Sequence, residues 1–165
     1  MKENYFHSFF GGFMKSYIVY RKEVCEILKE ENGIYELVPI SDDSIKYHIP
    51  KDSQVLRKII SKEEMEELLD LIPSIEVIPS KDKTLENVYK ELLAHGKHED
   101  LIKVIKTAYL RNQARLLNNK KISDKDDEYL KRAEKYLCDE FSVILNMNFE
   151  DTKNFVINKV KEVNV

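Results

Sequence analysis

Apolar and polar side chains alternate along Ser44-Ile45-Lys46-Tyr47-His48-Ile49-Pro50, and this alternation indicates how the first part of the chain folds. A period of two is that of a β-strand with one buried face. Ile45, Tyr47 and Ile49 are therefore expected to point inward. Beyond residue 60 the period changes, and apolar residues recur at helical spacing almost to the C-terminus, most clearly within 123–147. The sequence thus predicts a β module followed by a helical one.

Short runs with strand-like patterns precede residue 61, and turn signals at 31–33 and 41–43 separate the middle ones. The five predicted strands are Tyr17–Tyr20, Val24–Lys29, Gly33–Ile40, Ser44–Ile49 and Gln54–Ile60. Five short strands with tight connections are typical of a small β-barrel. We therefore expect an α+β protein in which a five-stranded barrel of the Tudor or SH3-like kind precedes an all-α helical bundle.

The helical part begins at Ser61, where Ser61 and Glu64 form a capping box ahead of an apolar stripe that ends before Pro73. Further helices are predicted at Thr84–His95, His98–Asn118, Ser123–Met147 and Phe149–Val163. The expected organisation is a leader at 1–13, either disordered or an added arm, a barrel at 14–60, a connecting helix and linker at 61–83, and a helical domain at 84–165.

Composition indicates an ordinary globular protein of 165 residues, with 42% hydrophobic residues and a net charge of −3. The sequence contains no apolar run of membrane-spanning length, and the pattern of the leader is unlike a signal peptide. Cys25 and Cys138 fit no metal spacing and are expected to be reduced thiols of a cytoplasmic protein. We find no motif for catalysis, a metal or a cofactor, so none of the three is expected, nor is a small-molecule substrate.

Between Ile102 and Ser123 there are six basic residues and no acidic one. On a helix, Ile102, Ile105, Tyr109 and Leu116 would form the buried face, leaving basic side chains on the other. Such a face suits a phosphate backbone, although a merely solvated surface is an equally good interpretation. The candidate DNA-contacting residues of this stretch are Lys103, Lys106, Arg111, Arg115, Lys120 and Lys121.

Four collinear segments resemble a known family. They are Tyr17-Ile-Val-Tyr20 with Val24-Cys25-Glu26-Ile27, Tyr35-Glu-Leu-Val38 leading to Tyr47-His48-Ile49-Pro50, Leu56 through Glu64, and the tail from Ala94 to Phe141. In this order they resemble the CarD family of bacterial transcription regulators, whose N-terminal module is shared with transcription-repair coupling factor. The resemblance spans about residues 14–160.

The resemblance implies a Tudor-like barrel that binds the β subunit of RNA polymerase and a helical domain that contacts promoter DNA. In the barrel, the basic contact of the family maps to His48, and Lys46 points the same way along the strand. Lys29 adds charge from the neighbouring hairpin. These three residues are the candidate polymerase contacts, and strand addition at 44–49 is the expected mode of docking.

The departures from the family concern mainly the DNA-binding half. Lys15-Ser16 stands where Gly-Asp is usual, and the turn glycine between the first strands is missing. The family's tryptophan wedge falls near Ile78 or Asp82, and the chain contains no tryptophan. Lys83 remains from the basic residues that follow the wedge. We therefore expect weak backbone contacts to promoter DNA, or alternatively a protein-only adaptor that binds polymerase or another protein without DNA.

Overall fold

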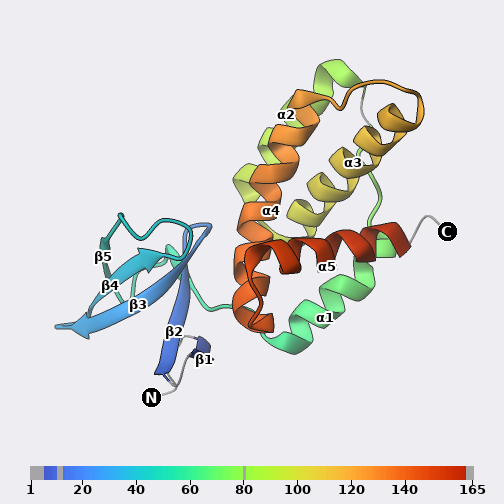
Figure 1. Ribbon diagram of the computed structural model, residues 1–165. Coiled ribbons are helices and arrows are strands. Elements are labelled where there is room, and N and C mark those ends of the chain that lie inside the picture. The colour runs from blue at the N-terminus through green and yellow to red at the C-terminus, as the bar shows by residue number, and fades with distance from the viewer. Residues whose placement is uncertain (1–5, 11–12, 80, 163–165) are drawn as a thin grey trace.

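The computed structural model describes residues 6–10, 13–79 and 81–162, which form a curled antiparallel sheet followed by a bundle of helices (Figure 1). The strands are β1 (Phe6–Phe10), β2 (Phe13–Tyr20), β3 (Glu23–Glu31), β4 (Ile34–Pro39), β5 (Tyr47–Pro50) and β6 (Leu56–Arg57). The helices are α1 (Lys62–Leu71), α2 (Asp82–His95), α3 (His98–Leu117), α4 (Asp124–Leu145) and α5 (Phe149–Lys161), with a 3₁₀ turn at Ile72–Ser74. The predicted α+β class, sheet first and helices second, is confirmed.

The sheet has the strand order β1-β2-β3-β4-β5 and curls into a half-barrel. β6 pairs with the end of β2, beyond the part of β2 that pairs with β1. Within the described residues, β5 therefore has a paired side toward β4 and an open side. The strand begins three residues later than the sequence predicts, since Asp42 Oδ1 accepts hydrogen bonds from the backbone N–H and the hydroxyl of Ser44. This turn leaves Ile45 exposed, so its predicted inward orientation is wrong.

Tight turns join the long strands. Asn32 and Gly33 both have positive φ, at 53° and 75°, and connect β3 to β4 in a two-residue hairpin, the geometry whose twist matches that of the flanking strands. Between β2 and β3, Arg21 adopts a φ of 57° at the turn where the resembling family has a glycine. Residues 6–10 of the leader form β1, and residues 1–5, 11 and 12 lie outside the described residues.

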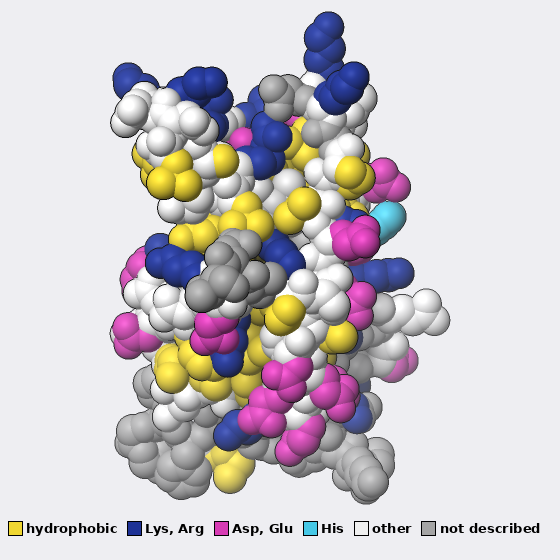
Figure 2. Space-filling model, turned by 90° about the vertical axis from the view of Figure 1, so that its right-hand side faces the viewer, with side chains coloured by type: hydrophobic (Ala, Val, Ile, Leu, Met, Phe, Trp, Pro, Cys, Tyr) yellow, Lys and Arg dark blue, Asp and Glu magenta, His cyan; other side chains and the backbone are white. Residues whose placement is uncertain are grey.

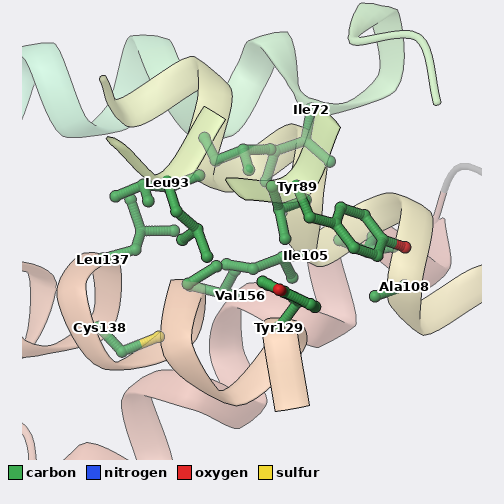
Figure 3. Packing of buried hydrophobic residues seen from close by; sticks show 14 of the residues in the cluster. Ile72, Tyr89, Leu93, Ile105, Ala108, Tyr129, Leu137, Cys138 and Val156 are labelled. Atoms are coloured by element: carbon green, nitrogen blue, oxygen red, sulfur yellow. The ribbon is translucent and has the colours of Figure 1, made fainter. Parts of the chain in front are cut away.

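The helices pack around α3, whose first three turns are buried on almost every side. The core gathers apolar side chains from all five described helices (Figure 3), including Tyr89, Ile105, Leu137 and Val156. Helix starts follow the predicted caps, since Ser61 accepts from the Glu64 N–H and Ser123 from the Asp126 N–H. In the part of the chain that is described, no helix is both long enough and apolar enough to cross a bilayer.

The half-barrel and the helices share a small apolar cluster, in which Tyr17, Val19 and Val24 pack with Ile59 and Val143. Val143 lies in the last turns of α4, which runs past the sheet (Figure 1). The two parts of the molecule therefore meet along α4, and this contact positions the surfaces described below.

Candidate functional site

The three predicted polymerase contacts lie together on one face of the half-barrel. The strand register places Lys29 opposite Glu36 and Glu36 opposite His48, so that one row of side chains crosses β3, β4 and β5. A shift in the β3 register between Ile27 and Lys29 sets this alignment. Lys46, just before β5, reaches the same carboxylate. We call Lys29, Lys46, His48 and Glu36 the edge cluster.

Glu36 is the centre of the edge cluster. Its carboxylate lies 3.8 Å from Lys29 Nζ, 3.4 Å from Lys46 Nζ and 3.9 Å from His48 Nε2. The Glu36 side chain is 14% exposed, whereas the three surrounding side chains are each more than half exposed. Ion pairs of this kind contribute little to stability in solvent. The basic side chains are therefore available to a partner's carboxylate that competes with Glu36.

The open side of β5 lies next to this cluster. A shallow groove of about 310 Å³ runs along the hairpin and is lined by Lys29, Glu31, Asn32, Ile34, Glu36 and His48. An unpaired strand edge presents backbone N–H and C=O groups that an added strand can satisfy. The sequence singled out Lys29, Lys46 and His48, but not Glu36, on which they converge, because this convergence depends on the strand register.

The basic stretch of α3 is not a single exposed face, and Lys106 is the clearest correction. Its side chain is buried, and Nζ donates to the backbone carbonyls of Ile72, Pro73 and Ile75 at 2.8, 3.2 and 2.7 Å. A lysine ammonium has three donors, and all three are used here. Lys106 thus holds the end of α1 and the following 3₁₀ turn, and its predicted DNA contact is withdrawn.

Arg111 is also used within the fold. Its Nε donates to Asp126 Oδ2 at 3.1 Å, and Tyr89 donates its hydroxyl to Asp126 Oδ1 at 2.8 Å. Asp126 is only 2% exposed, and Arg111 and Tyr89 supply the hydrogen-bond donors that a buried carboxylate needs. Reversing the charge of Arg111 would place two carboxylates together, which makes Arg111 unsuitable as a probe of DNA binding. Lys103, nearer the N-terminal end of the same helix, is half-buried.

The remaining candidates gather at one end of the helical bundle. Lys83 lies in the first turn of α2, and Arg115, Lys120 and Lys121 lie around the α3–α4 connection; we call these four exposed residues the tip. Arg115 Nε donates to the Lys121 carbonyl at 2.7 Å, which orders the loop. Figure 2 shows Lys and Arg side chains concentrated at this end.

Apolar side chains accompany the basic ones near the tip. Leu116 is 50% exposed and Leu117 is 84% exposed, so the prediction that Leu116 belongs to a buried face is wrong. The physical reason is that α3 extends beyond the helices that cover its first turns, so its last turn has no layer to pack against.

A buried ionic cluster that sequence reasoning missed joins the half-barrel to the helices. Glu140 of α4 is 1% exposed and accepts two hydrogen bonds from Arg57 of β6, at 2.9 and 2.7 Å. It also accepts from the Ile60 backbone N–H at 3.0 Å and lies 2.8 Å from His98 Nε2. Burial by itself raises the pKa of Glu140, but the hydrogen bonds and charges of Arg57 and His98 outweigh it and lower the pKa to about 2. The sequence signal that could have indicated a buried carboxylate was the position of Glu140 among the buried residues of α4.

No protein-family model matches this chain, and no curated protein is significantly similar to it.

Proposed function

We propose that this protein is a CarD-like transcription regulator that binds the β subunit of RNA polymerase through its half-barrel. The observation that supports this most directly is the edge cluster beside the open side of β5. Strand addition at β5 supplies main-chain hydrogen bonds, while Lys46 and His48 supply selectivity for an acidic partner strand. The β-then-α order found in the structure is also that of the family the sequence resembles.

Promoter DNA is the second proposed partner, contacted weakly by the tip. Phosphate contacts position a protein without reading sequence, so sequence selectivity in this proposal comes from polymerase. Glu140 supports a bridging role because its contacts with Arg57 and His98 fix the half-barrel relative to the helices. A fixed junction lets one protein hold polymerase and DNA at a defined separation.

Charge reversal of the edge cluster tests the polymerase contact. We expect the double variant Lys46→Glu, His48→Glu to lose at least about 100-fold in affinity for a purified polymerase β-subunit lobe, because like charges would then face the acidic partner strand. Biolayer interferometry measures the affinity, and circular dichroism checks the fold. The matched control is Lys120→Glu with Lys121→Glu, which lies at the tip and should bind the lobe normally. Equal affinity of both double variants for the lobe contradicts docking at this edge.

A second candidate is the adaptor that binds polymerase, or another protein, without DNA. It is favoured by the burial of Lys106 and by the pairing of Arg111 with Asp126, which leave fewer basic side chains for phosphates than the sequence suggests.

Salt dependence separates the two candidates. About four phosphate contacts at the tip predict a slope of about −3.6 in log K against log[salt]. This slope corresponds to about a 100-fold loss of affinity for forked promoter DNA between about 50 and 200 mM salt. Reversing Lys120 and Lys121 to Glu should reduce that slope by about 2. Fluorescence anisotropy measures both, with the edge double variant as the control. A wild-type slope near zero favours the adaptor.

A further inference from the structure

A cavity lies where the half-barrel meets α4 and the start of α5, and it is separate from both proposed partner surfaces. Its volume is about 470 Å³, within the range of about 300–1,000 Å³ that small-molecule sites occupy. The apolar part of its wall consists of Tyr17, Ile40, Val143, Met147 and Phe149. Interfaces between structural units are a common location for ligand sites.

Asp139 is the acidic group in this wall. Its side chain belongs to α4, is only 9% exposed and lines the cavity. Among the residues that the structure describes, no group donates a hydrogen bond to the Asp139 carboxylate; the neighbouring Ser142 hydroxyl donates to the Asp139 main-chain carbonyl instead. Removing a carboxylate from water without a hydrogen-bonding partner is costly. Among the described residues no completely buried side-chain oxygen lacks a partner, so the Asp139 carboxylate is still open to the cavity and takes its hydrogen-bond partners from there.

The nearby charges do not supply these partners. Lys135 also lines the cavity, but its Nζ is 3.6 Å from Glu23 Oε1, and Glu23 accepts a further hydrogen bond from the Tyr47 hydroxyl. Burial raises the pKa of Asp139 to about 6, with Lys135 opposing and Glu23 assisting the shift. Lys135 has the larger effect of the two, but its ammonium is shared with Glu23 and donates no hydrogen bond to Asp139, so the Asp139 charge is only partly offset.

We propose that this cavity binds a small organic cation, with an ammonium group on the Asp139 carboxylate and an apolar body against the surrounding wall. An ammonium supplies the missing charge and the missing donors at once, and charge-assisted hydrogen bonds are about twice as strong as neutral ones. Tyr17 and Phe149 add aromatic rings, whose faces attract cations. The ligand class is therefore a hydrophobic amine.

Two amine–alcohol pairs of equal shape test the proposal: 2-phenylethylamine with 2-phenylethanol, and n-hexylamine with hexan-1-ol. Ligand-observed NMR at pH 7.5 measures their affinity for the full chain. We expect at least one amine to bind in the millimolar range and its alcohol to bind at least about tenfold more weakly, in keeping with the loss of one charge-assisted hydrogen bond.

Two variants and one control locate the binding. Asp139→Asn keeps the shape of the side chain and should weaken the amine at least about tenfold, whereas Asp124→Asn, an exposed change on the same helix, should leave it unaltered. Ser142→Phe fills the cavity from a half-buried position and should abolish binding of both members of a pair. Three results would each overturn the proposal: failure of both amines to bind at about 10 mM, roughly tenfold above the expected millimolar Kd, equal binding of an amine and its alcohol, or undiminished binding to Asp139→Asn.

Discussion

Replacing Glu140 with alanine is expected to lower the free energy of unfolding by about 3–5 kcal/mol, the usual cost of removing one member of a buried ionic group. The variant leaves the Arg57 guanidinium, His98 and the Ile60 N–H without the carboxylate that all of them contact. Urea unfolding followed by circular dichroism measures the change. Because these contacts join β6 and the start of α3 to α4, the loss should also loosen the half-barrel from the helices.

Two further variants make this expectation specific. Glu140→Gln keeps the volume and one acceptor, so a smaller loss of about 2 kcal/mol is expected. Glu128→Gln is the control, since Glu128 is 64% exposed and lies 3.9 Å from Arg132 on the solvent side of the same helix, where a change of at most about 0.5 kcal/mol is expected. If Glu140→Ala unfolds at the same urea concentration as the Glu128 control, the cluster does not stabilise the junction.

The contribution of Glu140 also has a definite pH dependence. Its pKa is lowered from 4.5 to about 2 in the folded protein, so the folded state binds fewer protons than the unfolded chain between these values. The stabilisation is complete above about pH 4.5 and is lost as the pH falls toward 2. The difference in pKa corresponds to about 3 kcal/mol, which is comparable to the effect expected for the alanine variant.

Local patterns were sufficient to predict the secondary structure of most of this chain. The alternation around Tyr47 and Ile49 marked a strand, and the serines at 61 and 123 marked helix starts that the structure confirms by hydrogen bonds to Glu64 and Asp126. These features depend on neighbours within a few residues, which a sequence displays directly.

The depth of burial could not be predicted in the same way. Helical periodicity identifies which face of α3 is apolar, but it does not reveal that α3 is surrounded along its first turns and uncovered along its last. For this reason Lys106 was expected outside and lies inside, while Leu116 was expected inside and lies outside. Lys106 is tolerated in the interior because three carbonyls of residues 72–75 meet its ammonium.

Contacts between distant parts of the chain were the other missing information. Arg57 and Glu140 are 83 positions apart, and nothing local indicates that they meet. The edge cluster is an intermediate case, since Lys29, Lys46 and His48 were identified individually, whereas their convergence on Glu36 requires the pairing of three strands. Prediction from sequence was thus better for the members of the candidate site than for its geometry.

The second large effect is expected from Glu134→Gln, and it has the opposite sign at neutral pH. Glu134 lies on the buried side of α4 at 7% exposure. Burial is the main cause that raises its pKa to about 7; Asp127 and Glu150 raise it further, while Lys153 and Lys131 lower it. The charged form of Glu134 therefore destabilises the folded protein at pH 8.

The sign of the pH dependence follows from this raised pKa. Between about pH 4.5 and pH 7 the folded state binds more protons through Glu134 than the unfolded state does, so the stability contributed at this site falls as the pH rises and becomes constant above 7. The shift corresponds to about 3 kcal/mol. Glutamine has no ionisable proton, so the stability of the variant should not show this decline with rising pH.

Urea unfolding of the wild type and of Glu134→Gln at several pH values tests this expectation. The range from about pH 5 to 8 covers the span over which Glu134 changes charge. At the alkaline end the free energy of unfolding of the variant should exceed that of the wild type by about 3 kcal/mol. This difference should decrease steadily toward the acidic end. Glu128→Gln again serves as the control, because it replaces an exposed carboxylate on the same helix and should change the free energy of unfolding by at most about 0.5 kcal/mol. Only a group that titrates differently in the folded and unfolded states makes stability depend on pH. A raised Glu134 pKa is therefore contradicted if the difference in free energy of unfolding between the variant and the wild type is constant, or widens toward low pH.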